Sequence, residues 1–317
     1  SSAYNAKLYG KVEPRVAVSY SLSANAALKA SYSYTAQYDH MLTNSALGMP
    51  TDIWMPISRI IVPQTANTFS AGIHSAVADG AVELSAEAYY KTMDNVIEYK
   101  DGASYLNSST GWEDKVSMGR GWSYGVELLA QKKIGKTTGW IGYTWSKSMR
   151  QFDKPGNIIN DGNPFPAKYD RRHDLSATVT HAFSKKFDLS ATFVYSSGNC
   201  GSLSFEDYAG LDPYYDHLDN GNMRYITLPY LPNRNNYRMP AYNRMDIGMN
   251  FYKQKKRGTR VWNISAYNVY NRLNPFLVTT DFESEWDPVN ERYKTRVVLK
   301  KISVFPIIPS VSYTYKF

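Results

Sequence analysis

The last residues of the chain, IIPSVSYTYKF at positions 307–317, decide its fold class. Every second residue from Ile307 to Phe317 is aliphatic, proline or aromatic, and the residues between them, apart from Ile308, are polar. Strict alternation predicts a strand with one apolar and one polar face. The apolar face becomes aromatic towards its end, which is typical of a transmembrane β-barrel that meets lipid and ends in an aromatic girdle. The alternative is an ordinary amphipathic terminal strand in a soluble β-sandwich.

The composition of the 317-residue chain fits a barrel and argues against other classes. It contains 27 Tyr, 12 Phe and 7 Trp, and such rings suit belts between water and lipid. The mean hydropathy of −0.46 is compatible with a barrel, in which only alternate residues face lipid. No apolar run is long enough for a transmembrane helix. The net charge of +8 lies largely in expected turns, such as KKIGK and KQKKRG, so we expect no nucleic-acid partner. Cys200 is the single cysteine, so no internal disulfide is expected.

The alternation recurs along the chain in pairs of segments joined by short turns. Ala78-Asp79-Gly80 is one such turn and is a strong hairpin signal. PFLVTTDFES and RYKTRVVLKKISV flank a tip at residues 287–290 and are expected to extend beyond the membrane as two long strands. The pattern predicts about 11 strands for the barrel itself. They cover residues 16–22, 28–38, 67–77, 81–98, 116–131, 137–149, 174–183, 188–196, 242–253, 260–271 and 307–317.

Short turns and long connections alternate strictly, and the long ones are predicted as loops at 40–66, 100–115, 152–169 and 197–241. Outer-membrane barrels sort their connections in this way, with short periplasmic turns and long extracellular loops, whereas propellers and sandwiches do not. If the end at Phe317 is periplasmic, every short turn is also periplasmic. An odd number of strands predicts that further strands come from elsewhere, because an open edge would leave unpaired backbone in lipid. The start SSAYN, without Met, suggests a processed product or a fragment.

Several segments together resemble the C-terminal barrel of TonB-dependent outer-membrane receptors of the Bacteroidetes kind. The resemblance covers nearly the whole chain, and its segments occur in family order. It implies that residues 1–317 are one portion of a roughly 22-stranded barrel with a plugged lumen. The plug, the TonB-contacting box and the N-terminal strands are expected to be absent from this chain. The segments are GRGWSYGVELLAQKKIGKTTGWIGYTWSKSMRQF, FPAKYDRRHDLSA, MPAYNRMDIGMNF, NISAYNVYNRLNPF and FPIIPSVSYTYKF.

The resemblance implies part of a receptor that imports a scarce nutrient (siderophore, glycan, peptide or cofactor) by energised transport. It implies neither an enzyme nor a resident cofactor. The expected partners are an N-terminal plug and half-barrel fragment, TonB through the missing part, outer-membrane lipid and a surface lipoprotein, in the outer membrane of a Gram-negative, Bacteroidetes-like bacterium. The alternatives are a passive porin-like channel and a surface-binding or adhesion protein that the barrel anchors. A barrel-embedded hydrolase needs a catalytic cluster that the sequence does not offer.

Two motifs could carry chemistry, and each has a simpler interpretation. DRRHD (Asp170–Asp174) contains an Asp/His pair, but neighbouring strand residues point to opposite faces, and the resemblance implies a structural motif at the outer end of a strand. An acidic run in the expected long hairpin gives weak Ca²⁺ candidates, which a solvated hairpin explains as well. The five histidines lack the spacing of a zinc or haem site. The acidic run is Asp281, Glu283, Glu285 and Asp287, and the longest loop adds Asp207, Asp212, Asp216 and Asp219.

The remaining candidates fall into three groups. Glu83, Glu87 and Glu127 are predicted to face the lumen and to contact the plug. By the resemblance, Tyr313, Tyr315 and Phe317 form the signal for barrel assembly. Aromatic and polar residues of the long loops are the ligand-contact candidates, although packing between the loops would also explain them. They are Trp54, Arg59, Trp112, Phe205, Tyr208, Tyr214, Tyr215, Arg224 and Tyr237.

Overall fold

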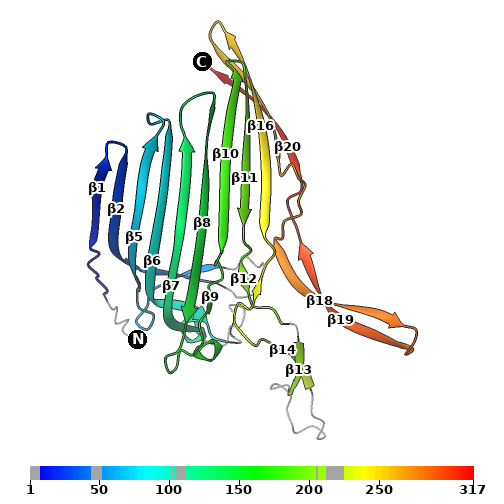
Figure 1. Ribbon diagram of the computed structural model, residues 1–317. Helices are drawn as coiled ribbons and strands as arrows, with labels where there is room; N and C mark the ends of the chain where they lie inside the picture. The colour runs from blue at the N-terminus through cyan, green and yellow to red at the C-terminus, as the bar shows by residue number, and fades with distance from the viewer. Residues whose placement is uncertain (1–7, 44–51, 102, 104–110, 205, 212–224) are drawn as a thin grey trace, which may run out of the picture.

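The computed structural model describes residues 8–43, 52–101, 103, 111–204, 206–211 and 225–317. These residues form one large antiparallel sheet whose strands follow the order of the chain, with short turns at one end and long connections at the other (Figure 1). Among the described residues, no helix has the length and apolarity to cross a membrane. The strands of the sheet, in order, are β1 (Arg15–Ser23), β2 (Ala26–Gln37), β5 (Gln64–Val77), β6 (Val82–Tyr99), β7 (Val116–Lys132), β8 (Thr137–Gln151), β10 (His173–Ser184), β11 (Phe187–Ser196), β16 (Tyr242–Lys255), β17 (Gly258–Tyr267) and β20 (Ile308–Lys316).

The sheet confirms the predicted strand order. It has 12 strands, of which 11 form the continuous path, and β9 (Phe165–Pro166) pairs only with β8. The predicted turn at Ala78-Asp79-Gly80 has positive φ at all three residues. β17 ends at Tyr267 and not at the predicted Asn271, because Asn268 takes a φ of 55° and leaves the extended conformation.

The long connections contain strands that the sequence interpretation treated as irregular loop. That expectation was wrong, because these strands are short and lack a long alternating pattern. Apart from β9, which pairs with β8, they pair with each other and not with the large sheet. The pairs are β3 (Asp39–Leu42) with β4 (Ile53–Pro56), β12 (Cys200–Gly201) with β15 (Tyr237–Arg238), and β13 (Glu206–Leu211) with β14 (Tyr225–Tyr230). The predicted long hairpin is present as β18 (Leu277–Asp287) and β19 (Arg292–Ile302), which form a separate sheet beyond the long-connection end (Figure 1).

The two faces of the large sheet differ in polarity because side chains alternate along each strand. One row of directly paired residues runs through Tyr20, Leu28, Ile73, Ala86 and Leu128. Side chains of this row stay exposed although they are apolar, for example Tyr20 at 66% and Leu128 at 45%. This surface is called the outer face below, and the opposite, polar surface is called the inner face.

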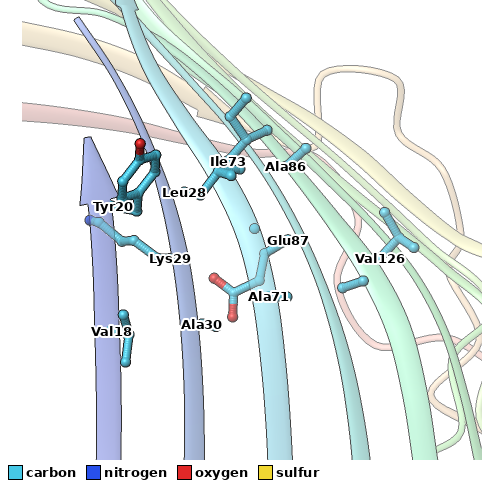
Figure 2. Close-up of a pocket in the computed structure, with 12 residues that line it drawn as sticks. Val18, Tyr20, Leu28, Lys29, Ala30, Ala71, Ile73, Ala86, Glu87 and Val126 are labelled. Atoms are coloured by element: carbon cyan, nitrogen blue, oxygen red, sulfur yellow. The ribbon is translucent and has the colours of Figure 1, made fainter. Parts of the chain in front are cut away.

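An apolar groove marks the outer face where the first strands lie side by side. Figure 2 shows Val18, Tyr20, Leu28, Ile73 and Val126 along its walls. These side chains come from β1, β2, β5 and β7, and all of them are exposed although they are aliphatic or aromatic. A broad exposed apolar surface of this kind is expected where a protein meets lipid.

Aromatic rings gather at two levels of the outer face. At mid-strand, Tyr32 packs on Phe69 with centroids 5.0 Å apart, and Tyr124 packs on Trp145 at 5.9 Å. Near the short turns, the row includes Phe183–Phe187 at 5.4 Å, Phe187–Phe251 at 5.1 Å and Trp262–Tyr313 at 4.9 Å. Two aromatic bands that flank an apolar strip correspond to the girdles of a transmembrane barrel.

Two small cores lie at the long-connection end, on opposite faces of the sheet. Ile97 packs with Leu42 and Ile61 from the connection that holds β3 and β4. Its neighbour Val96 packs with Phe152, Ile159 and Phe165. Because adjacent strand residues point in opposite directions, the first connection covers the outer face and the second covers the inner face. The connections are therefore packed structures at their base.

Three asparagines fasten the place where the β18–β19 hairpin leaves the large sheet. The buried Asn268 donates from Nδ2 to the carbonyls of Arg272 and Phe305, both at 3.0 Å. Asn271 accepts from the Ile307 N–H at 3.0 Å. Asn274 pairs with both backbone groups of Asn243 on β16, at 3.0 and 2.7 Å. This asparagine clamp lets β17 pair with β20 directly, although the hairpin is inserted between them.

Candidate functional site

The three predicted glutamates lie on the inner face. Glu87 on β6 pairs directly with Glu127 on β7, opposite the apolar pair Ala86 and Leu128 on the outer face. Glu83 lies nearer the short turns and forms an ion pair with Lys133 at 2.6 Å. Neither Glu87 nor Glu127 has an ion-pair partner within the described part of the chain. Their contact with a plug stays a prediction.

The predicted ligand-contact residues do not form one group. Trp54 and Tyr208 are exposed, at 62% and 53%, and Arg59 is exposed as well. Trp112 packs against the core around Ile97. The other members are Tyr237, which packs beside Leu203 and Met239, and Phe205, Tyr214, Tyr215 and Arg224, which lie outside the described residues.

A buried ion network that the sequence interpretation missed fastens the longest connection to the inner face. The Glu98 side chain is 3% exposed and accepts from Arg150 at the end of β8. Its other oxygen lies 3.3 Å from Nη2 of Arg234, whose side chain is 7% exposed. Arg234 also reaches Asp101 at 3.3 Å. Because a lone buried charge is costly, the carboxylate and the two guanidinium groups hold these segments together.

The DRRHD motif is structural. The Asp170 side chain is fully buried, accepts hydrogen bonds from the Ser148 N–H at 2.6 Å and from Arg238, and forms an ion pair with Arg172 at 3.3 Å. His173 lies on the outer face, where Nδ1 is 2.8 Å from the Tyr143 hydroxyl. The Asp170 carboxylate is thus held by Ser148, Arg172 and Arg238, and His173 by Tyr143, so the two side chains do not form a catalytic pair.

The buried network around Asp170 also encloses the single cysteine. Burial raises the pKa of the Cys200 thiol. A thiol in this state is a poor nucleophile because little thiolate is present at neutral pH.

The acidic run of the β18–β19 hairpin faces a row of cations. Glu283 is paired across the strands with Arg296 and lies 3.3 Å from it, and Asp281 accepts from Lys300. Within the described residues, no group of three or more His, Cys, Asp or Glu side chains could hold a metal ion. The remaining pairs of this ladder are Glu285 with Lys294 and Asp287 with Arg292.

The tip of this hairpin is closed by Asp287. The side chain of Asn290 donates to Asp287 at 2.7 Å, and the Val289 N–H donates to it at 3.0 Å. These hydrogen bonds, with that of Asn290 the largest cause, lower the pKa of Asp287 below its ordinary value. The carboxylate therefore serves the turn and is not free for a ligand.

The start of β16 carries a polar cluster on the inner face. Arg244 and Asp246 alternate with the apolar Met245 and Ile247. Arg244 contacts Asp246 at 3.0 Å and the Tyr267 hydroxyl at 2.9 Å. The alternation of residues 242–246 could have placed this cluster on the inner face, but nothing local indicates that Tyr267 completes it.

The comparisons with known proteins agree with this arrangement. The family model described as "TonB dependent receptor-like, beta-barrel" matches residues 2–271. The chain belongs to the TonB-dependent receptor family. Members of this family are receptors and transporters of the outer membrane, and the fold expected from the sequence is confirmed.

Solved TonB-dependent receptors share this fold over about a third of their own length. The ferric-catecholate import receptor Fiu from E. coli K12 is 14% identical, with a TM-score of 0.52 over 95% of this chain and 34% of that one. The siderophore receptor PiuA from Acinetobacter baumannii is 15% identical, with a TM-score of 0.53 over 94% and 35%. The ferripyoverdine receptor of Pseudomonas aeruginosa is 14% identical, with a TM-score of 0.54 over 84% and 30%. No curated protein matches the sequence.

Proposed function

We propose that the protein forms part of a TonB-dependent outer-membrane receptor that imports a scarce nutrient by energised transport, in a Gram-negative bacterium of the Bacteroidetes kind. The short turns then face the periplasm and the long connections face outwards. The iron chelates named for the solved relatives support a siderophore as one candidate ligand; a glycan, a peptide and a cofactor are the others. Additional strands of the receptor pair with the free edges of β1 and β20, because unpaired backbone in lipid costs several kcal/mol per group.

The Glu87–Glu127 pair is the observation that carries this proposal. Like charges directly opposite each other on paired strands destabilise a sheet, so the pair calls for a cation. An arginine or lysine of a plug inside the barrel supplies that cation. TonB acts through the plug, and a surface lipoprotein covers the long connections.

Conductance of the full-length receptor in planar bilayers tests the plug contact. The wild-type channel is expected to stay closed. The double variant Glu87→Gln, Glu127→Gln is expected to open about tenfold more often in mild urea. The reason is that the proposed ion pair between the glutamates and the plug cation would be lost, which weakens the contact between plug and barrel by more than about 1.4 kcal/mol. Glu83→Gln is the matched control, since Glu83 already has Lys133. An open wild-type channel supports a passive pore, and an unchanged double variant rejects the plug contact.

Cells test the energised step separately. Import predicts that ligand still binds to the outer membrane after a protonophore collapses the proton gradient, while ligand no longer reaches the periplasm. Accumulation that continues without the gradient contradicts energised transport and favours the passive channel. Binding with no accumulation under either condition favours a surface-binding protein.

A further inference from the structure

The inner face near the long connections carries a fixed arginine that the glutamate pair and the buried networks do not involve. Arg244 lies near the start of β16, where the neighbouring outward positions are Met245 and Ile247. Its side chain lies on the inner face and is 24% exposed. A molecule that enters from the long-connection end would pass this position early.

Four contacts fix the orientation of the Arg244 guanidinium. Nε donates to Asp246 at 3.0 Å, and Nη1 donates to the hydroxyls of Tyr242 at 3.1 Å and Tyr267 at 2.9 Å. The guanidinium also lies over the Tyr267 ring, 4.3 Å from its centroid. The second oxygen of Asp246 accepts from the Asn268 N–H at 2.9 Å, so the carboxylate is itself held by the asparagine clamp. A group held in this way loses little conformational entropy when it binds a ligand.

The free edge of this cluster consists of hydrogen-bond donors. Nη2 of Arg244 carries two N–H groups and has no acceptor among the described residues. The hydroxyls of Tyr242 and Tyr267 lie 3.4 Å apart, so at most one of their hydrogens is used between them and the other stays free. Both hydroxyl oxygens already accept from Nη1. The edge therefore offers three donors, and its natural complement is a group with several acceptor oxygens.

We infer that Arg244, with Tyr242 and Tyr267, forms a ligand subsite for a carboxylate of the imported molecule. Asp246 orients the arginine and does not compete for it, because both of its oxygens are occupied within the fold. A lysine could not replace the arginine here, because an ammonium group cannot span Asp246 and both hydroxyls while it keeps donors free. The inference rests on the proposed function, since it assigns a chemical group to the ligand of that receptor.

Citrate is the probe for this subsite, because it presents three carboxylates and no metal is needed. The full-length receptor in detergent is titrated with citrate, and binding is measured by saturation-transfer NMR on the citrate methylene protons. We expect saturable binding by the wild type. Arg244→Gln and Arg244→Lys are each expected to weaken it by about tenfold or more, because a hydrogen bond between two charged groups contributes about 1.5–3 kcal/mol. Tyr267→Phe removes one contact to Nη1 and is expected to weaken it by a few fold.

Tyr252→Phe is the matched control. Tyr252 lies on the same strand and the same face, and its hydroxyl donates to Asp188 at 2.8 Å near the short turns. This variant should bind citrate as the wild type does. Heat-modifiable migration on a gel verifies that each variant forms a folded barrel. If Arg244→Gln does not fold, Arg244→Lys and Tyr267→Phe still give the comparison.

The inference is overturned if the wild type shows no saturable citrate binding, or if the Arg244 variants bind as tightly as the wild type. Neither result depends on energised transport, because the titration needs no TonB or proton gradient. If citrate binding depends on Arg244 and the cells show no gradient-dependent import, the subsite stands and the proposed transport fails. If import depends on the gradient and citrate binding does not depend on Arg244, the proposed transport is supported and the proposed subsite is rejected.

Discussion

Arg234→Ala should release the longest connection from the inner face without unfolding the sheet. The Arg234 side chain is 7% exposed and bridges Glu98 and Asp101, both at 3.3 Å. Breaking a buried ion pair costs about 3–5 kcal/mol when the remaining charge is left alone. Here Glu98 keeps Arg150, so we expect a smaller loss of about 2–3 kcal/mol in the local free energy of opening.

Hydrogen exchange of the full-length receptor measures this change. A loss of about 2–3 kcal/mol corresponds to exchange that is roughly 30–150 times faster, since each 1.4 kcal/mol is a factor of ten. The acceleration should be confined to residues 198–204 and 231–241. Protection in β7 and β8 should stay as in the wild type, because their ladder hydrogen bonds are not involved.

Arg120→Ala is the matched control for this prediction. Arg120 pairs with Asp153 at 2.7 Å at the same end of the sheet, but the two side chains are 54% and 36% exposed. Exposed pairs contribute about 0–1 kcal/mol, so exchange should rise by less than about fivefold. The reasoning about buried charge is refuted if Arg234→Ala exchanges like the wild type, or if the two variants accelerate exchange equally.

Three further predictions concern single positions. Gly125→Val should lower the stability of the folded barrel by about 1–3 kcal/mol, because a Cβ there would lie 2.6 Å from a neighbouring carbonyl. Gly142→Ala should not lower it, because the nearest atom to a Cβ there is 3.6 Å away. The urea concentration at the midpoint of heat-modifiable migration compares the stabilities of the two variants. Cys200 should react with a maleimide only after unfolding, because burial raises its pKa and limits access, and fast labelling of the folded receptor would contradict this. Because the pKa of Asp287 is lowered, its carboxylate stabilises the turn fully above pH 3.8, and this stabilisation is lost as the pH falls further. The amide resonance of Asn290, whose N–H donates to Asp287, should shift over the same pH range. A resonance that stays constant between roughly pH 5 and 2, the range in which a carboxylate titrates, would contradict the contact.

The large sheet could be predicted from the sequence because its signal is local. Period-two alternation over nine or more residues marks each strand and also fixes which face is apolar, as the paired row through Leu28 and Ile73 confirms. The turn at residues 78–80 could also be predicted from the sequence, because its conformation depends on its own residues.

The packing of the long connections could not be predicted in the same way. Glu98 and Arg234 are 136 positions apart, and neither lies in a pattern that points to the other. Asn95 takes a φ of 59° and makes a bulge in β6. The alternation of the β6 residues before the bulge therefore does not predict which face Glu98 occupies. Trp112 and Tyr237 illustrate a second difficulty, since both pack against hydrophobic cores. The sequence around an aromatic loop residue does not distinguish a ligand contact from a core position.

The asparagine clamp makes the β18–β19 hairpin an exchangeable unit. The chain leaves the sheet after Tyr267 and returns at Ile308, and these two residues are direct partners in the ladder. The length of whatever lies between them therefore has no influence on strand stagger, and so none on the diameter of the closed barrel. Homologous receptors could carry a longer, shorter or differently shaped projection here with the same transmembrane wall, provided that Asn268, Asn271 and Asn274 remain to fasten the junction. A hybrid receptor built by exchange at this junction would inherit a new outer surface while its assembly stays unchanged.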